Sequence, residues 1–186
     1  MDSGEVIRTF SDENNRCLNR NEANQSIFDF ADLYHIYSAG IKEVRTKLEI
    51  LDGEFLLIHE HNPIHHIESR LKSPQSIVNK LSEKRLDITN ENIRKHIKDV
   101  AGIRVICSYI EDIYRISALL LGQNDVKLLR KRDYIERPKD SGYRSLHLIV
   151  SIPVYFSDRV EEVSVEIQIR TIAMDFWATL EHQIKY

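Results

Sequence analysis

Apolar residues recur every three or four positions over a long segment in the first third of the chain. They fall at Phe30, Tyr34, Tyr37, Ile41, Val44, Leu48, Leu51 and Phe55. This spacing places them on one face of a helix, and it predicts a single long helix that starts near Asp29 and ends before Pro63. The first 28 residues carry few apolar side chains and show no clear period, which predicts a flexible or loosely docked extension over residues 1–28.

Shorter helix and strand patterns follow a histidine-rich segment around Pro63, which we interpret as a turn. Ser73 and Pro74 predict a helix start, because a capping hydroxyl is favoured just before a proline in the first turn. Further helices are predicted over residues 90–97, 111–121 and 171–184, and strands over 103–107, 126–129, 146–152 and 162–169. The last two strands are expected to be antiparallel neighbours. The pattern therefore predicts an α+β fold, a mixed β-sheet flanked by helices, in one domain over residues 29–186.

Composition limits the class of protein. The chain has 186 residues, of which 42% are hydrophobic, enough for one buried core. Its longest apolar runs fall far short of the roughly 18 residues that a membrane span requires. The first ten residues lack the apolar centre of a secretion signal, and two isolated cysteines suggest neither a disulfide framework nor a zinc site. We expect a cytoplasmic protein.

The formal net charge of −3 argues against a protein whose whole surface binds nucleic acid. Any anion site must therefore be local. The segment from Arg130 to Arg144, expected to be a loop, holds six basic residues, including Arg132 and Lys139, against three acidic ones. Tyr143 presents a ring beside these cations, an arrangement that suits a stacked base with bound phosphates.

Two carboxylates stand where a metal site is chemically reasonable. Glu166 lies on the polar side of a strand pattern that alternates apolar and polar residues, and Asp99 comes just before the strand over 103–107. Together they are candidates to bind Mg²⁺, which takes one or two protein carboxylates and leaves positions for substrate phosphates. The alternative for Glu166 is a half-solvated antiparallel strand with no site.

Basic side chains also gather around the helix that begins after Ser73. Arg70 and Lys72 precede this helix, and Ser76, Lys80 and Lys84 recur along one side of it. A bound polyphosphate would offset the repulsion between the cations, and the free N–H groups at the helix start favour an anion as well. A merely solvated basic face is the alternative.

Arg104 is the one charge in an apolar strand, so it is expected to meet an anion or a stacked ring, or else to form a structural salt bridge.

None of the six glycines forms a Walker A or Gly-x-Gly-x-x-Gly pattern, which excludes a P-loop. Four histidines flank Pro63 without a cysteine or carboxylate that would complete a zinc set, and we interpret them as surface residues: His59, His61, His65 and His66.

Four segments of the chain together resemble a known family. They are Arg70-x-Lys72 with Ser76 and Lys80, Asp99-Val-Ala-Gly-Ile-Arg104, Lys139-Asp-Ser-Gly-Tyr-Arg-Ser-Leu-His147, and Val165-Glu-Ile-Gln-Ile-Arg170-Thr. In this order and spacing they resemble the synthetase domain of RelA/SpoT-type (p)ppGpp synthetases, the GTP pyrophosphokinases. The resemblance runs from about Asp29 to the last residue. Within the family, the length and the segment from Met174 to His182 look like the small alarmone synthetases.

The resemblance implies a nucleotidyltransferase-like fold and a defined reaction. The 3′-hydroxyl of GDP or GTP would attack the β-phosphate of ATP, giving (p)ppGpp and AMP. Asp99 and Glu166 would hold Mg²⁺, and Glu166 would also take the hydroxyl proton. On the ATP side, Arg70 and Arg104 would flank adenine, with Lys72, Ser76 and Lys80 at the phosphates. The acceptor side would be formed by Arg132, Lys139, Tyr143, His147 and Asp175, with Tyr143 stacked on guanine.

Several features depart from the family pattern. Glu83 stands where relatives often carry arginine, with Lys84 beside it as a substitute, and Asp175 stands where some carry asparagine near the guanine. No His-Asp dyad occurs, so the hydrolase activity of the family is not expected. Small synthetases usually continue beyond the position of Tyr186 into helices that assemble tetramers. We therefore expect either a fragment or a homo-oligomer that assembles differently.

Two other functions stay open. Some relatives are toxins that pyrophosphorylate tRNA 3′ ends or adenine nucleotides, and Asp175 with the guanine-side loop would decide between the acceptors. The second is an inactive RNA-binding module that uses residues 130–144, although no feature of the sequence indicates RNA directly. Such a module would still bind RNA, in a salt-sensitive way, after loss of both carboxylates.

Overall fold

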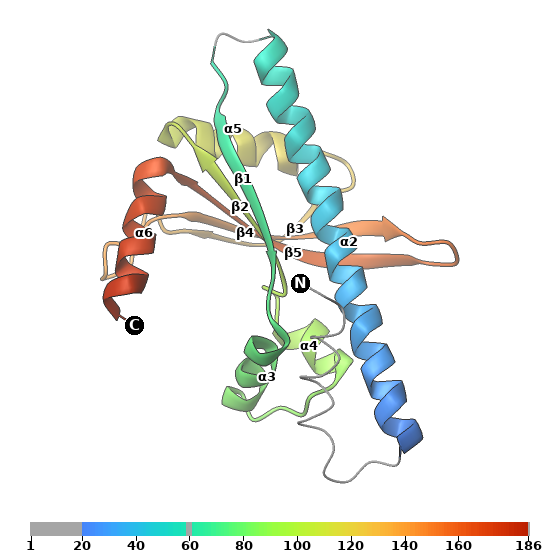
Figure 1. Ribbon diagram of the computed structural model, residues 1–186. Coiled ribbons are helices and arrows are strands. Elements are labelled where there is room, and N and C mark those ends of the chain that lie inside the picture. The colour runs from blue at the N-terminus through green and yellow to red at the C-terminus, as the bar shows by residue number, and fades with distance from the viewer. Residues whose placement is uncertain (1–19, 59–60, 186) are drawn as a thin grey trace.

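The computed structural model describes residues 20–58 and 61–185, so most of the predicted extension over residues 1–28 lies outside the described part. Figure 1 shows the helices arranged around one sheet. The elements are α2 (Arg20–Ile58), β1 (Ile64–Leu71), α3 (Pro74–Glu83), α4 (Asn90–His96), β2 (Ala101–Cys107), α5 (Ile110–Leu121), β3 (Lys127–Asp133), β4 (Leu146–Tyr155), β5 (Val160–Thr171) and α6 (Ile172–Lys185).

The five strands form one mixed sheet in the order β1-β2-β5-β4-β3. The pairs β1–β2, β5–β4 and β4–β3 are antiparallel, and the central pair β2–β5 is parallel. The predicted mixed sheet is confirmed, and so is the antiparallel pairing of the strands predicted over 146–152 and 162–169. The parallel pair brings together two segments that are separated along the chain by β3 and β4.

The long predicted helix is α2, which crosses one face of the sheet diagonally (Figure 1) and contacts β1, β2, β4 and β5. Its buried side chains follow the predicted face: Phe30, Leu33, Ile36, Tyr37, Ile41, Val44, Leu48, Leu51 and Phe55. The helix begins at Arg20 rather than near Asp29. A helix that is already nucleated by its packed part can continue through polar residues, which the apolar period alone does not detect.

Gly40 allows α2 to approach β5 closely. A Cβ at this position would lie 2.5 Å from Cγ1 of Val163 and 3.4 Å from Cγ2 of Val165. Glycine weakens a helix by roughly 0.5–1 kcal/mol relative to alanine. At Gly40 this weakness is offset by close contact between the helix and the sheet.

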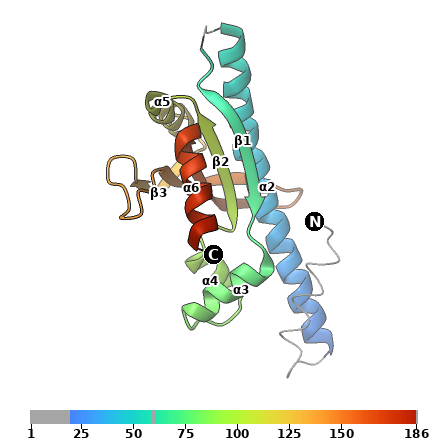
Figure 2. The same cartoon turned by 60° about the vertical axis from the view of Figure 1, so that its left-hand side comes forward.

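The other helices pack around the sheet. α5 lies beside the C-terminal part of α2, where the guanidinium of Arg115 is 4.6 Å from the ring centroid of Phe55. α6 contacts β2 and β5 and lies on the opposite side of the sheet from α2 (Figure 2). α3 and α4 contact each other beyond one end of the sheet (Figure 1). As predicted, Ser73 caps α3, and its Oγ accepts a hydrogen bond from the N–H of Ser76 at 3.3 Å.

The strand β1 over residues 64–71 was not predicted, and one prediction about local structure was wrong. Residues 130–133, expected in the basic loop, belong to β3. Both β1 and β3 are edge strands with mostly exposed side chains. Edge strands often carry charged residues, so the apolar alternation that marks an inner strand is absent from them.

The histidine-rich segment lies at the surface in the part that the structure describes. His61, His65 and His66 are exposed, as predicted, whereas His59 lies outside the described residues. Nε2 of His61 is 2.9 Å from the buried carboxylate of Asp112. Among the described helices, none is long and apolar enough to cross a membrane.

Candidate functional site

Two rows of side chains run across all five strands on the sheet face opposite α2. Residues that pair across neighbouring strands point to the same face, so the strand registers assemble each row. The first row is Arg70, Gly102, Glu166, Ile149 and Arg130, and the second is Glu68, Arg104, Gln168, His147 and Arg132. Five predicted site residues, one from each strand, therefore share one surface: Arg70, Arg104, Arg132, His147 and Glu166.

Asp99 stands in the turn between α4 and β2, beside the first row. Its Oδ2 accepts hydrogen bonds from Nζ of Lys72 at 2.9 Å and from Nζ of Lys80 at 2.6 Å. Burial raises the pKa of the Asp99 carboxyl, but the hydrogen bonds and charges of Lys80 and Lys72 outweigh burial and leave the pKa below its usual value. Asp99 is therefore a carboxylate at neutral pH, held by two lysines.

Glu166 projects from the centre of β5 onto the same surface. Its Oε2 accepts a hydrogen bond from Nε2 of Gln168 at 3.0 Å, and Nδ1 of His147 lies 3.5 Å from its Oε1. Burial raises the pKa of Glu166, as does the charge of Asp99 to a smaller degree. The contacts with His147 and Gln168 outweigh both effects, so the pKa lies below its ordinary value.

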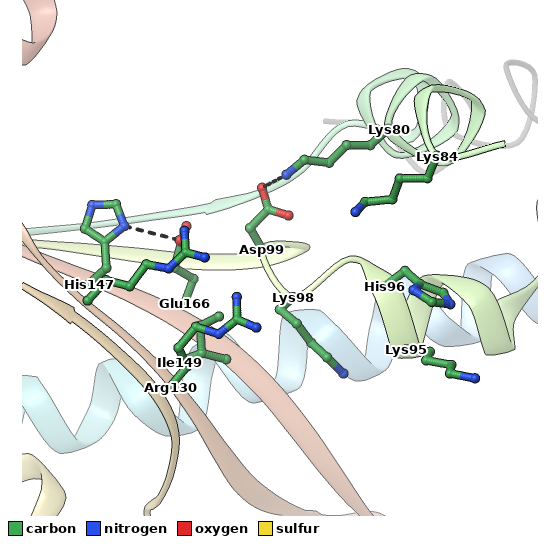
Figure 3. Close-up of a pocket in the computed structure, with 11 residues that line it drawn as sticks. Lys80, Lys84, Lys95, His96, Lys98, Asp99, Arg130, His147, Ile149 and Glu166 are labelled. Atoms are coloured by element: carbon green, nitrogen blue, oxygen red, sulfur yellow. Dashed lines mark hydrogen bonds and ion pairs between the residues drawn. The ribbon is translucent and has the colours of Figure 1, made fainter. Parts of the chain in front are cut away.

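Asp99 and Glu166 line two neighbouring hollows. The larger is a cavity of about 510 Å³, lined by Lys80, Lys84, Lys95, His96, Lys98, Asp99, Arg130, Arg132, His147, Ile149 and Glu166. Six lysine and arginine side chains face two carboxylates there, so the cavity is strongly cationic. Figure 3 shows Lys80 and Lys84 extending from α3 toward Asp99, while His147 meets Glu166 at the other side.

The smaller hollow, of about 60 Å³, is lined by the same two acids together with Glu68, Ser69, Arg70, Gly102, Ile103, Arg104 and Gln168. Arg70 and Arg104, predicted to flank a base, thus come from neighbouring strands to one recess. Nη1 of Arg104 pairs with Glu68 at 3.2 Å and with Asp175 at 3.5 Å, while its buried Nε has no partner. The salt bridge considered as the alternative for Arg104 is therefore present beside the recess.

The remaining residues predicted for the ATP side occupy different positions. Lys80 lines the large cavity, and Lys72 reaches the site through Asp99. Ser76 lines neither hollow, and its Oγ lies 2.8 Å from Oγ of Ser73 in the first turn of α3. The structure thus brings the two lysines to Asp99 and leaves Ser76 at the helix start.

Aromatic rings and cations gather around His147, where the sequence predicts the acceptor side. The hydroxyl of Tyr143 shares a hydrogen bond of 2.9 Å with Nε2 of His147. Nζ of Lys139 lies 4.8 Å from the ring centroid of Tyr143 and 5.0 Å from that of Tyr134. Arg132 donates a hydrogen bond of 3.3 Å to the Tyr134 hydroxyl. Four predicted residues are therefore brought together, with Tyr134 as an additional member.

Asp175 joins this cluster from α6 through Arg170. Oδ1 of Asp175 lies 3.4 Å from Nη1 of Arg170 and 3.5 Å from Nη1 of Arg104. Arg170 is only 3% exposed and also donates to Gln168 and to the Tyr143 hydroxyl. Neither Arg170 nor Gln168 was predicted as a site residue. Their signal was the polar side of the strand pattern, which they share with Glu166.

Lysine, arginine and histidine side chains from two other elements line the large cavity and were not predicted as site residues either. Lys95, His96 and Lys98 come from the end of α4 and the turn after it, and Arg130 comes from β3. Basic residues in a last helical turn usually complement the helix dipole, so their sequence pattern alone indicates no ligand. The contacts of α4 with α2 and α3 place its basic residues at the cavity, and strand pairing does the same for Arg130.

Two carboxylates that line the same cavity suit a hard divalent cation. Mg²⁺ is commonly held by one or two carboxylates together with water and substrate phosphates, and it needs no full cage of protein ligands. Across residues 20–58 and 61–185, no three histidine, cysteine or acidic side chains gather closely enough to hold a metal ion. The donor set of Asp99 and Glu166 therefore fits an ion that enters with a phosphate ligand.

The arrangement is suited to the transfer of a phosphate-containing group. A cationic cavity neutralises polyphosphate charge, and an ionised carboxylate at its wall can take a proton from an attacking hydroxyl. Phosphoryl transfer depends mostly on such positioning and charge neutralisation, because the protein has little covalent chemistry to perform.

Comparison with known proteins gives consistent relatives. A family model described as the region found in RelA / SpoT proteins matches residues 69–186. GTP pyrophosphokinase YwaC of Bacillus subtilis (strain 168) is 52% identical over 151 residues, 81% of this chain and 72% of that protein. The crystal structure of small alarmone synthetase 2 from Bacillus subtilis matches with a TM-score of 0.76 at 47% identity, over 85% of this chain and 80% of that one. Small alarmone synthetase 1 from Bacillus subtilis, bound to its product pppGpp, matches with a TM-score of 0.74 at 36% identity, over 81% and 76%.

Proposed function

The chain belongs to the RelA/SpoT family, and we propose that it is a GTP pyrophosphokinase of the small alarmone synthetase group. It transfers the β- and γ-phosphates of ATP, as pyrophosphate, to the 3′-hydroxyl of GDP or GTP, and the products are (p)ppGpp and AMP. The observation that carries this proposal is that Asp99 and Glu166 line both the cationic cavity and the smaller recess with two arginines. A phosphate group held beside these two acids can be reached from the donor side and from the acceptor side.

In the proposed reaction, the 3′-oxygen of the acceptor attacks the β-phosphorus of ATP. The new bond joins these two atoms, and the bond from the β-phosphorus to the oxygen that bridges it to the α-phosphate breaks. AMP leaves with that oxygen and the electron pair. Glu166 takes the proton of the 3′-hydroxyl, and its lowered pKa keeps it ionised for this role at neutral pH.

The donor nucleotide occupies the side of the site nearest α3 and β1. Arg70 and Arg104 flank the adenine in the small recess, and Lys72 and Lys80 hold the phosphates. These two lysines are already within 3 Å of Asp99, which keeps their ammonium groups beside this carboxylate. Ser76 belongs to the same proposed group through its position in the first turn of α3, where N–H groups favour phosphate.

The acceptor nucleotide occupies the side of the site nearest β3, β4 and α6. Tyr143 stacks on guanine, and Arg132, Lys139 and His147 surround the acceptor sugar and phosphates. The cation–ring distances of about 5 Å around Tyr143 and Tyr134 support a surface that is both aromatic and positively charged. Asp175 is the proposed contact to the edge of the base.

We assign Asp99 and Glu166 as the protein ligands of Mg²⁺. When bound, the ion supplies charge neutralisation to the phosphates that are transferred. The two residues keep their negative charge at neutral pH because their pKa values are lowered, as a metal ligand requires. The enzyme is expected in the cytoplasm, where its nucleotide substrates are found.

The decisive experiment incubates the protein with γ-labelled ATP and Mg²⁺ together with GDP, GTP, tRNA or excess unlabelled ATP. Label on GDP or GTP supports the proposal, and Asp99→Ala and Glu166→Ala should each abolish transfer. Asp158→Ala, at the exposed β4–β5 turn, is the matched control and should retain activity. Transfer of the label to tRNA, or to the ribose hydroxyl of a second adenine nucleotide, would indicate a toxin-type enzyme instead. No labelled acceptor, with RNA binding that survives both substitutions, would indicate an RNA-binding module.

Homo-oligomerisation remains a prediction from the family resemblance. Light scattering on the purified chain, whose mass is 21.8 kDa, measures it directly. A molar mass near a multiple of this value supports a homo-oligomer, and a value that stays near the monomer mass at all concentrations contradicts it.

A further inference from the structure

One buried arginine connects the two side chains that contact Glu166. Arg170 lies near the end of β5 and is 3% exposed. Its Nη2 donates a hydrogen bond of 3.1 Å to the Tyr143 hydroxyl and another to Oε1 of Gln168. Each Nη of a guanidinium carries two hydrogens, so a single nitrogen serves both acceptors. Nη1 lies 3.4 Å from Asp175, which balances the charge.

The first connection runs through Gln168. A side-chain amide has one accepting end and one donating end, and a guanidinium only donates. Because Oε1 of Gln168 faces Arg170, Nε2 must face the other way, and it donates to Oε2 of Glu166 at 3.0 Å. A flipped amide would direct its NH₂ group at Nη2 and its oxygen at the carboxylate. Arg170 therefore fixes the orientation of this amide.

The second connection runs through Tyr143 and His147. The Tyr143 hydroxyl accepts from Arg170, which leaves its own hydrogen free to be donated to Nε2 of His147 at 2.9 Å. A neutral imidazole that accepts at Nε2 carries its hydrogen on Nδ1. Nδ1 lies 3.5 Å from Oε1 of Glu166, so a hydrogen on Nδ1 lies next to the carboxylate. The other tautomer would present a lone pair to a negative charge.

We propose that Arg170 is a positioning residue that sets which group donates and which accepts at each contact in this closed ring of side chains. The ring consists of Arg170, Gln168, Glu166, His147 and Tyr143. Arg170 acts at a distance: because the guanidinium can only donate, Oε2 of Glu166 accepts a hydrogen bond from Gln168, and Oε1 faces a hydrogen on Nδ1 of His147. The inference rests on the proposed function, in which Glu166 takes the proton of the acceptor hydroxyl. The same ring links Glu166, the proposed proton acceptor, to Tyr143, whose aromatic ring is the proposed stacking partner of guanine.

The direct test is the tautomer of His147, measured from the ¹⁵N shifts of the imidazole in labelled full-length protein near pH 8. His147→Gln identifies the signal by its disappearance. In the wild-type protein we expect the neutral form with hydrogen on Nδ1, and in Arg170→Gln and Tyr143→Phe a shift toward the Nε2–H form. Arg159→Gln, at the exposed β4–β5 turn, should leave the spectrum unchanged.

Two spectroscopic outcomes would overturn the proposal. One is an Nε2-protonated His147 in the wild-type protein, and the other is an unchanged tautomer in both Arg170→Gln and Tyr143→Phe. Arg170 is buried, so Arg170→Gln can fail to fold, which circular dichroism would detect. In that case Tyr143→Phe, which removes only a hydroxyl from a half-buried residue, tests the connection through Tyr143, and an unchanged tautomer in this variant overturns the proposal.

Kinetics separate positioning from a purely structural role. Tyr143→Phe keeps the stacking ring, so we expect kcat to fall about 10- to 100-fold, as for other residues that orient a ligand or base, with KM for the acceptor nearly unchanged. A folded Tyr143→Phe enzyme with wild-type kcat would contradict the proposal. Absence of transferase activity in the wild-type protein would overturn the proposed function instead, and the tautomer measurement would still report on the ring.

Discussion

Asp99 is held in this structure by the same groups that ATP is proposed to recruit. Its Oδ2 lies 2.6 Å from Lys80 and 2.9 Å from Lys72. In the proposed enzyme–substrate complex, these ammonium groups turn to the phosphates, and the carboxylate becomes available to Mg²⁺. The ion pairs therefore stabilise the free protein and also keep the cations and the metal ligand close together until the nucleotide arrives.

Asp99→Asn should lower the stability of the protein at neutral pH by about 1 kcal/mol, as partly exposed ion pairs contribute at most about this much. The pKa of Asp99 is lowered in the folded state, so its stabilising effect is full above the ordinary pKa of about 4 and is lost as the pH falls through the lowered value. Urea midpoints at pH 7 and pH 5 should show the same gap between the two proteins, which closes only below about pH 4.

The control for this measurement is Asp158→Asn, whose side chain is 70% exposed. It should show little difference from the wild-type protein at any pH. An Asp99→Asn variant that is as stable as the wild type at pH 7 would mean that the ion pairs of Asp99 with the two lysines do not contribute to the free energy of unfolding.

Gly102→Val tests whether the small recess binds adenine. A Cβ at Gly102 would meet nothing closer than the backbone oxygen of Arg70 at 3.6 Å, and valine is favoured in strands, so the fold should tolerate it. The added methyl groups project into the recess beside Arg70 and Arg104. We expect KM for ATP to rise about tenfold, equivalent to about 1.4 kcal/mol, with KM for GDP and the melting temperature nearly unchanged. An unchanged KM for ATP would show that adenine binds elsewhere.

At the level of single residues, the carboxylates are easier to predict from the sequence than the side chains that hold them in position. Glu166 stands out because it alternates with buried neighbours in β5. The same alternation places Arg170 on the polar side, which suggests an exposed side chain. Its actual burial depends on contacts with Tyr143 and Asp175, which come from other segments. No local pattern contains this information.

Among the elements, α2 offers a matched pair of glycines. At Gly40 an added Cβ would meet Val163 at 2.5 Å, whereas at Gly53 nothing lies within 4 Å. Gly40→Ala should therefore lose about 1–3 kcal/mol to overpacking, partly offset by better helix propensity. Gly53→Ala should gain up to about 1 kcal/mol from propensity alone.

Thermal or urea denaturation of both variants measures these opposite effects. A stabilised Gly40→Ala protein would show that α2 and β5 can separate at little cost. Since both substitutions lie in one helix and add the same atom, the comparison removes differences in intrinsic helix preference.

The sequence predicts elements well where one side is buried and poorly at the sheet edges. The sequence patterns predicted, within a few residues, the start of the helix over 74–83, the helices over 90–96 and 110–121, and the inner strands. β1 and the second half of β3 were missed because their side chains are mostly exposed and charged, so they carry no apolar alternation. Yet these edges supply Arg70, Arg130 and Arg132 to the site.

At the scale of the whole molecule, the charge of the cavity opposes that of the chain. The chain has a net charge of −3, while six lysine and arginine side chains face two carboxylates in the cavity. Raising NaCl from about 50 to about 500 mM should increase KM for both nucleotides severalfold, with a smaller effect on kcat, because salt screens such attraction.

The variant Lys95→Glu should raise KM at low salt and weaken its salt dependence, since Lys95 lines the cavity. Lys42→Glu, on the exposed side of α2, makes the same change in net charge and should alter neither. Equal effects of the two substitutions would assign the salt dependence to overall charge rather than to the cavity.

The strand order could not be predicted from the sequence. Antiparallel neighbours such as β4 and β5 are joined by a short turn, so residues close together in the sequence determine their pairing. The parallel pairing of β2 with β5 is different, because β3 and β4 lie between them in the chain. Hydrophobic patterns identify both strands as buried but do not say which buried strands are partners.

The parallel pairing of β2 and β5 also bears on how the protein is made. When β2 leaves the ribosome, the edge that β5 will cover stays unsatisfied until residues 160–171 follow. Contacts between such distant segments form late, because a large loop must close, at a cost in chain entropy, before the contacts can stabilise the fold. Nascent chains should therefore remain catalytically silent, and prone to capture by chaperones at this edge, until synthesis has passed Thr171.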